Sequence, residues 1–348
     1  MKKAFLLFAF TVINVFSKAQ NVYIPDANFK AYLVGNSSIN TNGDNEIQKS
    51  EAIAFTGTID CSAKNISTLI GIEEFVNITS LMCTQNQLTT LDISKNTALT
   101  YLDCSVNQLA DLDISKNILL NTLWCYNNQL ISLDISKNTV LIQLGCYRNL
   151  LTNLNISTNT ALQNLICYNN QITNLDLSKN LALKELYCYR NQLTTLDISK
   201  NTALTMFFCD QNQLTSLNLK NGNNVILTQM DALNNPNLTC IQVDNVANAN
   251  SYSNWKKDTT ASYDTDCLLS VNDAEKPQIK IYPNPVKDVL HFSQEIANIK
   301  ITDISGKMVK EISANRKSVN IANLSKGVYI ISAITKSGEK INQKIVKE

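Results

Sequence analysis

The chain has 348 residues, of which 44% are hydrophobic, so it is long enough to form more than one unit with a sizeable core. Its net charge of +1 lacks the basic field on which typical nucleic-acid and membrane-surface binding proteins depend, so neither partner class is expected. The only histidine is His291, which excludes histidine-based catalytic triads and zinc clusters.

The first residues have the pattern of a secretory signal. Met1-Lys2-Lys3 is a positive n-region, and a short apolar run follows it. Ser17 to Ala19 supplies small residues for cleavage, so residues 1–19 are predicted to be a signal peptide and Gln20 the mature N-terminus. A buried helix is the alternative. No later apolar stretch is long enough to span a bilayer, so we expect an exported chain without a membrane span.

Residues 20–56 are predicted to be an N-terminal cap, with a helix over residues 26–33. Within this cap, the segment from Asn40 to Glu51 resembles an EF-hand loop, although asparagine stands at its first position and Asn45 replaces the usual glycine. The candidate calcium ligands are Asn40, Asn42, Asp44, Glu46, Gln48 and Glu51. Two interpretations remain open, a metal-free capping loop, which we favour, and a weak calcium site.

A repeat array follows over residues 57–268. Its marker is a cysteine at every 21st residue, namely Cys83, Cys104, Cys125, Cys146, Cys167, Cys188 and Cys209. The full frame is L-x-C-x-x-N-x-L-x-x-L-D-I-S-K-N, and its first asparagine is present in all seven copies. Alternation predicts two short strands in each copy, with leucine and cysteine inside and the asparagine at a corner. Stacked asparagines are expected to form an internal ladder.

This frame resembles a leucine-rich repeat, with cysteine at a position where leucine is common. The resemblance covers roughly residues 57 to 240 and implies a stacked solenoid whose usual work is recognition. We therefore expect a mainly β fold of β/β coils with a short helical N-terminal cap. One coil cannot bury its own leucines, so both ends must be closed, and the altered copy around Met230 and Ala232 is expected to cap the second end.

The cysteines have two interpretations. Exported proteins usually form disulfides, but small apolar thiols at an inward stacked position can simply fill a narrow core, which we favour for the seven repeat cysteines. No CxxC pair or histidine accompanies them, which argues against metal binding. Cys240 and Cys267 lie outside the period and flank Trp255 in the predicted C-terminal cap, so we expect these two to form a disulfide.

An outward column of charges is predicted on the second strand of each copy. Aspartate recurs at Asp92, Asp113, Asp134, Asp176 and Asp197, with lysine three positions later. Where aspartate is replaced, by Asn155 or Asn218, the lysine is replaced too. We interpret this as mutual neutralisation on a solvated face. A calcium or ligand site is the alternative.

A second outward column is aromatic and is the candidate binding site. Tyrosine follows the cysteine in four consecutive copies, whereas the end copies carry threonine, serine or aspartate there, so the coil itself does not require tyrosine. Exposed aromatic residues with interspersed arginines are typical of interfaces. Ring stacking along the ladder is the structural alternative. The candidate ligand-binding residues are Tyr126, Tyr147, Tyr168, Tyr189, Trp124, Tyr187, Phe208, Arg148 and Arg190.

After a predicted linker at residues 269–277, four motifs occur in order at the C-terminal end. They are Ile281-Tyr282-Pro283-Asn284-Pro285-Val286, Asp303-Ile304-Ser305-Gly306-Lys307-Met308-Val309, Leu324-Ser325-Lys326-Gly327-Val328-Tyr329-Ile330 and Gln343-Lys344-Ile345-Val346-Lys347-Glu348. Together they resemble the C-terminal sorting domain of the type IX secretion system of Bacteroidetes, over residues 278–348. The resemblance implies a small immunoglobulin-like β-sandwich that the secretion machinery reads and normally removes. Alternating strands independently predict an all-β unit.

These features predict a secreted or outer-membrane cell-surface binding protein with no enzymatic activity and no cofactor beyond a weak calcium ion. Neither a GxSxG nor a phosphate-loop pattern occurs. The partner would be a protein or a polysaccharide at the cell surface, and the secretion machinery would bind residues 278–348. A structural surface spacer or adhesin without a specific ligand, and an accessory to a polysaccharide-processing enzyme, remain as alternatives.

Overall fold

The computed structural model describes residues 20–267, 280–335 and 340–348, so the predicted signal peptide at 1–19 and the predicted linker at 269–277 lie outside the described residues. The chain divides into two compact units, Met1–Ser270 and Val271–Glu348. Within the described residues, no helix is both long and apolar enough to cross a membrane.

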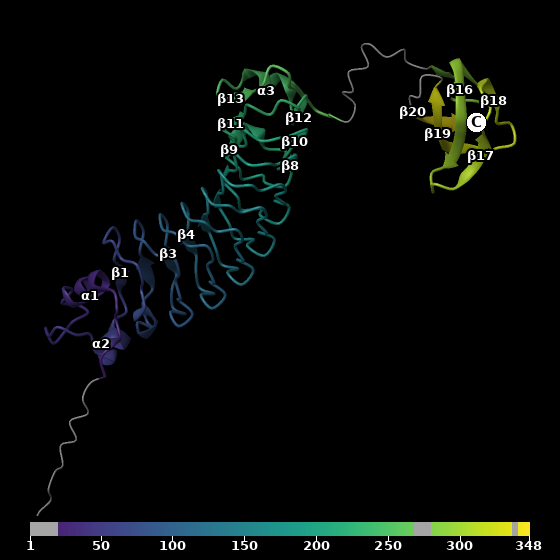
Figure 1. The fold of residues 1–348 in the computed structure, drawn as a ribbon. Helices are drawn as coiled ribbons and strands as arrows, with labels where there is room; N and C mark the ends of the chain where they lie inside the picture. The colour runs from purple at the N-terminus through teal and green to yellow at the C-terminus, as the bar shows by residue number, and fades with distance from the viewer. Residues whose placement is uncertain (1–19, 268–279, 336–339) are drawn as a thin grey trace, which may run out of the picture. The chain divides into compact units, whose positions relative to one another are not determined.

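Two short helices close the first end of the coil, α1 (Ala27–Val34) and α2 (Lys49–Ala54) (Figure 1). Asp26 caps α1, because one of its carboxylate oxygens accepts the backbone N–H of Phe29 at 3.0 Å. Its other oxygen accepts the N–H of Ser67 at 2.7 Å, which joins the helix to the first repeat. Phe29 and Leu33 on α1 are fully buried. The predicted helix is therefore confirmed, and it seals the hydrophobic end of the stack.

The main body is a parallel sheet of ten strands in which each coil contributes one strand and pairs with the next coil in register (Figure 1). Pairing is always between equivalent residues, for example Leu102 with Leu123. The strands are β1 (Thr58–Asp60), β2 (Ser80–Met82), β3 (Tyr101–Asp103), β4 (Thr122–Trp124), β5 (Gln143–Gly145), β6 (Asn164–Ile166), β7 (Glu185–Tyr187), β9 (Met206–Phe208), β11 (Gln229–Ala232) and β13 (Trp255–Lys257).

The predicted asparagine ladder is present beside this sheet. We call Asn86, Asn107, Asn128, Asn149, Asn170, Asn191 and Asn212 the strand-side asparagines. The amide of Asn149 donates to the carbonyls of Cys125 and Cys146, both at 3.0 Å. Its oxygen accepts the N–H of Leu130 at 3.0 Å. Each such side chain therefore satisfies backbone groups of two neighbouring coils, which a corner between short strands leaves unpaired.

The opposite side of the coil differs from the prediction of a strand in every copy. Among the described residues a second sheet forms only near the C-terminal end, from β8 (Thr195–Asp197), β10 (Ser216–Asn218), β12 (Cys240–Gln242) and β14 (Ser262–Asp264). In earlier coils a second set bridges the turns, the turn-side asparagines Asn96, Asn117, Asn138, Asn159, Asn180 and Asn201. For example, the amide of Asn138 donates to the carbonyls of Ile114 and Asn117 at 3.2 and 2.9 Å.

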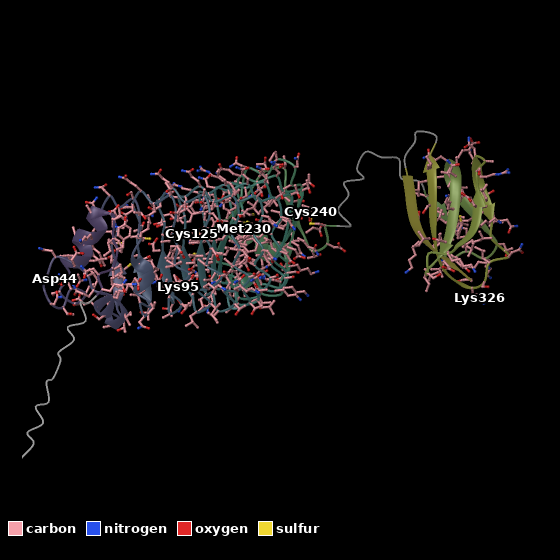
Figure 2. All side chains as sticks on the ribbon, turned by 60° about the horizontal axis from the view of Figure 1, so that its bottom comes forward. Asp44, Lys95, Cys125, Met230, Cys240 and Lys326 are labelled. Carbon is pink, nitrogen blue, oxygen red and sulfur yellow. A yellow bond between two sulfur atoms is a disulfide. The ribbon has the colours of Figure 1, made fainter. Side chains whose placement is uncertain are left out.

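The cysteines behave as predicted. The seven repeat cysteines and Cys61 are free and buried, and burial raises the pKa of the Cys61 thiol to about 12. The predicted disulfide between Cys240 and Cys267 is present, with a Cα to Cα distance of 5.7 Å. Figure 2 shows Cys125 inside the coil and the disulfide beside Cys240 near the end of the stack.

The second end is closed by residues that follow the last regular copies. Among the residues that the structure describes, the coil contains two 3₁₀ helices: η1 (Ile72–Glu74) lies in the first repeat, and η2 (Asn224–Ile226) precedes the altered copy around Met230. Helix α3 (Val246–Ser251) covers the last coils (Figure 1). Trp255 is 7% exposed, and its indole N–H donates to the carbonyl of Leu227 at 2.7 Å. The C-terminal cap thus buries the last leucines of the stack.

The second unit is an all-β fold, as predicted. Its strands are β15 (Ile281–Tyr282), β16 (Val289–Asp303), β17 (Met308–Ile312), β18 (Arg316–Asn320), β19 (Gly327–Thr335) and β20 (Lys340–Lys347). The long strand β16 pairs antiparallel with β15, β17, β18 and β19, and its register shifts along its length. Leu290, Ile301 and Ile331 are among the fully buried residues of its separate core. β16 is therefore the strand with the most partners in this unit, and β20 joins the sheet through β19.

Candidate functional site

The tyrosine row, Tyr126, Tyr147, Tyr168 and Tyr189, forms a stack along the coil. Neighbouring ring centroids lie 4.3, 4.4 and 4.2 Å apart, with interplanar angles of 6, 18 and 9°. The spacing follows from the in-register coils, because each tyrosine directly follows a buried cysteine at the end of a strand. All four rings are half-buried. Their faces cover one another, so the row presents ring edges and phenol hydroxyls to the solvent.

Beside the tyrosine row lies the strand-face row, formed by the third residue of successive strands: Trp124, Gly145, Ile166, Tyr187 and Phe208. Tyr187 and Phe208 stack with centroids 5.0 Å apart, and the hydroxyl of Tyr187 donates to the sulfur of Met206 at 3.3 Å. Trp124 meets Tyr126 edge to face, with an interplanar angle of 80°. The two rows lie side by side on the ten-stranded sheet, and we call them together the aromatic surface, although Gly145 and Ile166 interrupt the aromatic residues of the strand-face row.

Gly145 is the residue of this surface that sequence reasoning missed. A Cβ atom at this position would lie 2.1 Å from Cε3 and 2.3 Å from Cζ3 of Trp124, so the indole occupies the space of the missing side chain. The sequence contained a signal, because glycine stands at a position where other copies carry larger residues such as Asp103, Ile166 and Tyr187. A glycine inside a strand often marks a close approach. Here it positions Trp124.

The arginines lie at the edge of the tyrosine row. Arg148 and Arg190 are exposed, and each follows a tyrosine of the row directly. Nε of Arg190 donates to Oε1 of Gln211 at 3.0 Å. The structure thus brings all nine predicted ligand-binding residues to one surface. Their role in binding stays a prediction.

The phenols of Tyr147 and Tyr189 are uncharged at neutral pH. Burial raises the pKa of Tyr189 to about 12, and the neighbouring Tyr168 adds to this effect. Burial also raises the pKa of Tyr147, helped by the phenols of Tyr126 and Tyr168 on either side. At the end of the row, burial raises the pKa of the Asp210 carboxyl. The surface can therefore donate and accept hydrogen bonds without a change of charge near neutrality.

The predicted calcium ligands form a self-contained network. Glu51 accepts the N–H of Thr41 at 2.8 Å and, through its other oxygen, the N–H of Gln48 at 2.9 Å, so it is part of the capping box of α2. Asp44 accepts the side-chain amides of Asn42 and Gln48 at 3.0 and 2.9 Å. Glu46 pairs with Lys30 at 2.6 Å, and Asn40 donates to the carbonyl of Val34 at 3.0 Å.

This arrangement does not fit a calcium ion. Amide N–H groups point at the carboxylate oxygens that the ion would need, and the buried Asn40 donates hydrogen bonds inward. Within the described residues, no group of three or more histidine, cysteine, aspartate or glutamate side chains could hold a metal ion. The loop therefore suits the capping role that the sequence left open.

We expect calorimetry of the wild-type chain with millimolar calcium to show no heat of binding. We also expect Glu51→Gln to lower the free energy of unfolding by about 2 kcal/mol, because the buried N–H groups that Glu51 accepts lose a charged acceptor. Burial would raise the pKa of Glu51, but hydrogen bonds from Gln48, Thr41 and Asn42 outweigh it and lower that pKa. The contribution is therefore present above the unfolded value and is lost as pH falls through the folded one. Calcium-dependent heat with a raised melting temperature would contradict this interpretation.

The aspartate column has a role besides the predicted neutralisation. Each carboxylate accepts the N–H of the serine two residues on, as Asp113 does from Ser115 at 2.9 Å. The hydrogen bonds from Ser115 lower the pKa of Asp113, and the charge of Lys116 lowers it further, although no direct ion pair joins the column to these lysines in the described residues. Asn155 and Asn218 accept the equivalent N–H at 3.0 Å. Both residue types close the same turn, which explains why asparagine can replace aspartate.

In the second unit, the motif residues hold its two ends together. Asn284 accepts the N–H of Val346 at 2.8 Å and donates to the carbonyl of Lys344 at 3.1 Å. Asp303 accepts N–H groups of Ser305 and Lys307, which closes the turn before β17. The hydroxyl of Tyr329 donates to the carbonyl of Ser325 at 2.8 Å. These motif residues therefore join the two ends of the unit and close its turns.

Residues 280–348 match the family described as the secretion system C-terminal sorting domain. β-Agarase D of Zobellia galactanivorans is 25% identical over 90 residues, which are 26% of this chain and 19% of that protein. Internalin J of Listeria monocytogenes is 38% identical over 74 residues, which are 21% of this chain and 8% of that protein. The chain thus spans less than a fifth of the length of either relative.

Two solved structures from Listeria monocytogenes are similar at low identity. The functional domain of internalin J, which includes a cysteine ladder, has a TM-score of 0.44 and 19% identity, covering 94% of this chain and 98% of that one. Internalin C2 has a TM-score of 0.48 and 20% identity, covering 63% and 93%. The chain is thus an in-register repeat coil followed by a unit, residues 280–348, that matches the secretion system C-terminal sorting domain.

Proposed function

We propose that the solenoid binds a protein or glycan partner at the cell surface through the tyrosine row and the strand-face row, without catalysing a reaction. The observation that carries this proposal is the restriction of the row to four central coils. Thr84 and Ser105 occupy the same position in earlier coils, so the coil folds without tyrosine there. Aromatic side chains that remain partly exposed to water lose the free energy that burial would give, and such residues are enriched where a partner covers them.

Export supports the same proposal. We propose that the sorting domain directs the solenoid through the type IX secretion system to the cell surface or medium, where a recognition surface can meet an external partner. Deletion of residues 280–348 is the direct test, because the solenoid carries a core of its own. Retention of the truncated chain inside the cell supports export by this domain, and unchanged surface display would contradict it.

Replacement of Tyr126, Tyr147, Tyr168 and Tyr189 by serine is expected to leave the fold intact and to abolish capture of the partner in a pull-down from host or environmental material. The fold should survive because the rings lie outside the leucine and cysteine core, and because serine already occupies this position at residue 105. The change removes three stacked pairs. The melting temperature and circular dichroism check the fold, and the pull-down checks binding.

The matched control changes four side chains on the other side of the coil, replacing Asp113, Asp134, Asp176 and Asp197 by asparagine. Asn155 and Asn218 show that the turn accepts asparagine, so this variant should fold and should capture the partner like the wild type. Undiminished capture by the serine variant would instead favour a structural spacer whose rings serve only to stack.

A further inference from the structure

We propose that the ligand of the aromatic surface is a linear neutral polysaccharide that lies along the coil axis, with one sugar ring against Trp124. This inference rests on the proposed function and names the chemistry of the partner. Its first basis is periodicity. The tyrosine row repeats the same hydroxyl and ring edge at intervals of 4.2 to 4.4 Å between ring centroids. A ligand that uses every copy must itself repeat one chemical group, as a linear polysaccharide does and a globular protein without repeats does not.

The second basis is the position of Trp124. The rings of Tyr147 and Tyr168 are covered on both faces by parallel neighbours, so a sugar cannot stack on them. Trp124 is different, because its only ring contact among the described residues is the edge-to-face contact with Tyr126. Aromatic faces carry partial negative charge and attract the partly positive C–H groups on the apolar face of a sugar ring. Gly145 holds the half-exposed indole in place for this contact.

The third basis is a pair of uncharged amide side chains near Trp124. Gln143 and Asn164 lie on β5 and β6, on the same face of the sheet as Trp124, and both are half-buried. No hydrogen bond of either side chain is found within the described residues, so both amides can bind sugar hydroxyls. The phenols of Tyr147 and Tyr189 remain protonated near neutral pH. The charges nearby are of both signs, from Asp103 beside Trp124, Glu185 beside Asn164, and the exposed Arg148 and Arg190. Amides, phenols and an indole among mixed charges suit neutral hydroxyl groups better than a strongly charged partner.

Tryptophan fluorescence of the full chain can test this directly. The chain has two tryptophans, and Trp255 is 7% exposed and hydrogen-bonded in the C-terminal cap, so a change on binding reports Trp124. The probes are linear oligosaccharides of glucose, galactose, mannose and xylose, with chitosan oligomers as a cationic series. We expect at least one neutral series to shift the emission. Its affinity should rise with chain length until the oligosaccharide spans the four tyrosines, and should change little between low salt and 1 M salt.

Two variants test the position of the indole. Gly145→Ala keeps Trp124 but places a Cβ atom 2.1 Å from its ring, so the ring must move and the affinity should fall about tenfold. Trp124→Ala removes the ring, so its affinity for the oligosaccharide should fall at least as far. Calorimetry measures this affinity, because the variant lacks the fluorescent reporter. Trp124→Ala also provides the test if Gly145→Ala does not fold. The control is Leu181→Ala, on an exposed turn, which should bind like the wild type.

The outcomes separate this inference from the proposed function. If no neutral oligosaccharide binds at millimolar concentration, the proposal of a polysaccharide ligand is overturned. Equal affinities of Gly145→Ala, Trp124→Ala and the wild type would overturn it as well. Preference for the chitosan series would replace it with a cationic ligand on the indole. If capture of a protein in the pull-down depends on the tyrosine row while no sugar binds, the proposed function stands and the polysaccharide falls.

Discussion

Asn149→Ala is expected to destabilise the solenoid by about 3 kcal/mol, because truncation leaves a buried N–H and two buried carbonyls without partners. These groups are the N–H of Leu130 and the carbonyls of Cys125 and Cys146. Asn149 is 6% exposed, so water cannot replace all three hydrogen bonds. Urea unfolding followed by circular dichroism measures the loss.

The turn-side asparagines provide an internal comparison. Asn138 is fully buried and donates to two carbonyls, but its oxygen has no hydrogen-bond partner within the described part of the chain. Asn138→Ala removes this unpaired oxygen together with the two hydrogen bonds, so its loss should be smaller, about 1 to 2 kcal/mol. Equal losses, or a larger loss at Asn138, would show that the strand-side ladder is not the main polar link between coils.

Loss of the disulfide is the second large effect. Replacement of both Cys240 and Cys267 by alanine should lower the unfolding free energy by about 3 to 4 kcal/mol, as expected for a closed loop with a sequence separation of 27. The loop contains α3 and Trp255, the residues that seal the last coil. Because each coil is stabilised by contacts with its neighbours, local unfolding should begin at the end that loses its cap. Hydrogen exchange of β12 to β14 should therefore accelerate most.

Reductant supplies the control for this experiment. Dithiothreitol should lower the melting temperature of the wild type to that of the double variant and should leave the double variant unchanged. Cys146→Ala is a matched variant at a free thiol, and Ala232 shows that the coil accepts alanine at this position. Dithiothreitol should lower the melting temperature of Cys146→Ala by as much as it lowers that of the wild type. A wild-type melting temperature that ignores the reductant would refute a stabilising role for the bond.

Much of the fold could be predicted from this sequence because the repeat multiplies every signal. A buried leucine, cysteine and asparagine recur in each coil, so one local pattern fixes the register of the whole sheet. The cap helix was predictable because Asp26 precedes an apolar segment, and the disulfide because Cys240 and Cys267 leave the period. The second sheet was not predictable in extent, since Asp113 and Asp197 sit in the same frame although only Asp197 lies in a strand.

Other features depend on contacts that spacing does not contain. The turn-closing role of the aspartates was not predicted, because the recurrence of aspartate and lysine does not reveal that a backbone N–H two residues away is the nearer partner. The glycine at 145 gains its meaning only when the indole of the preceding coil is seen to fill its space. The directions of the amides of Asn42 and Gln48, which bear on whether the loop can bind calcium, likewise cannot be obtained from spacing.

Hydroxyl-radical footprinting of the solenoid with its captured partner tests the central claim most directly, since aromatic side chains report their own accessibility. We predict protection of Trp124, Tyr126, Tyr147, Tyr168, Tyr189, Tyr187 and Phe208 in the complex. Exposed residues of the turns, Leu119 and Leu181, should label as they do in the free chain. Protection of these turn residues, with unchanged labelling of the tyrosine row, would contradict recognition through the aromatic surface.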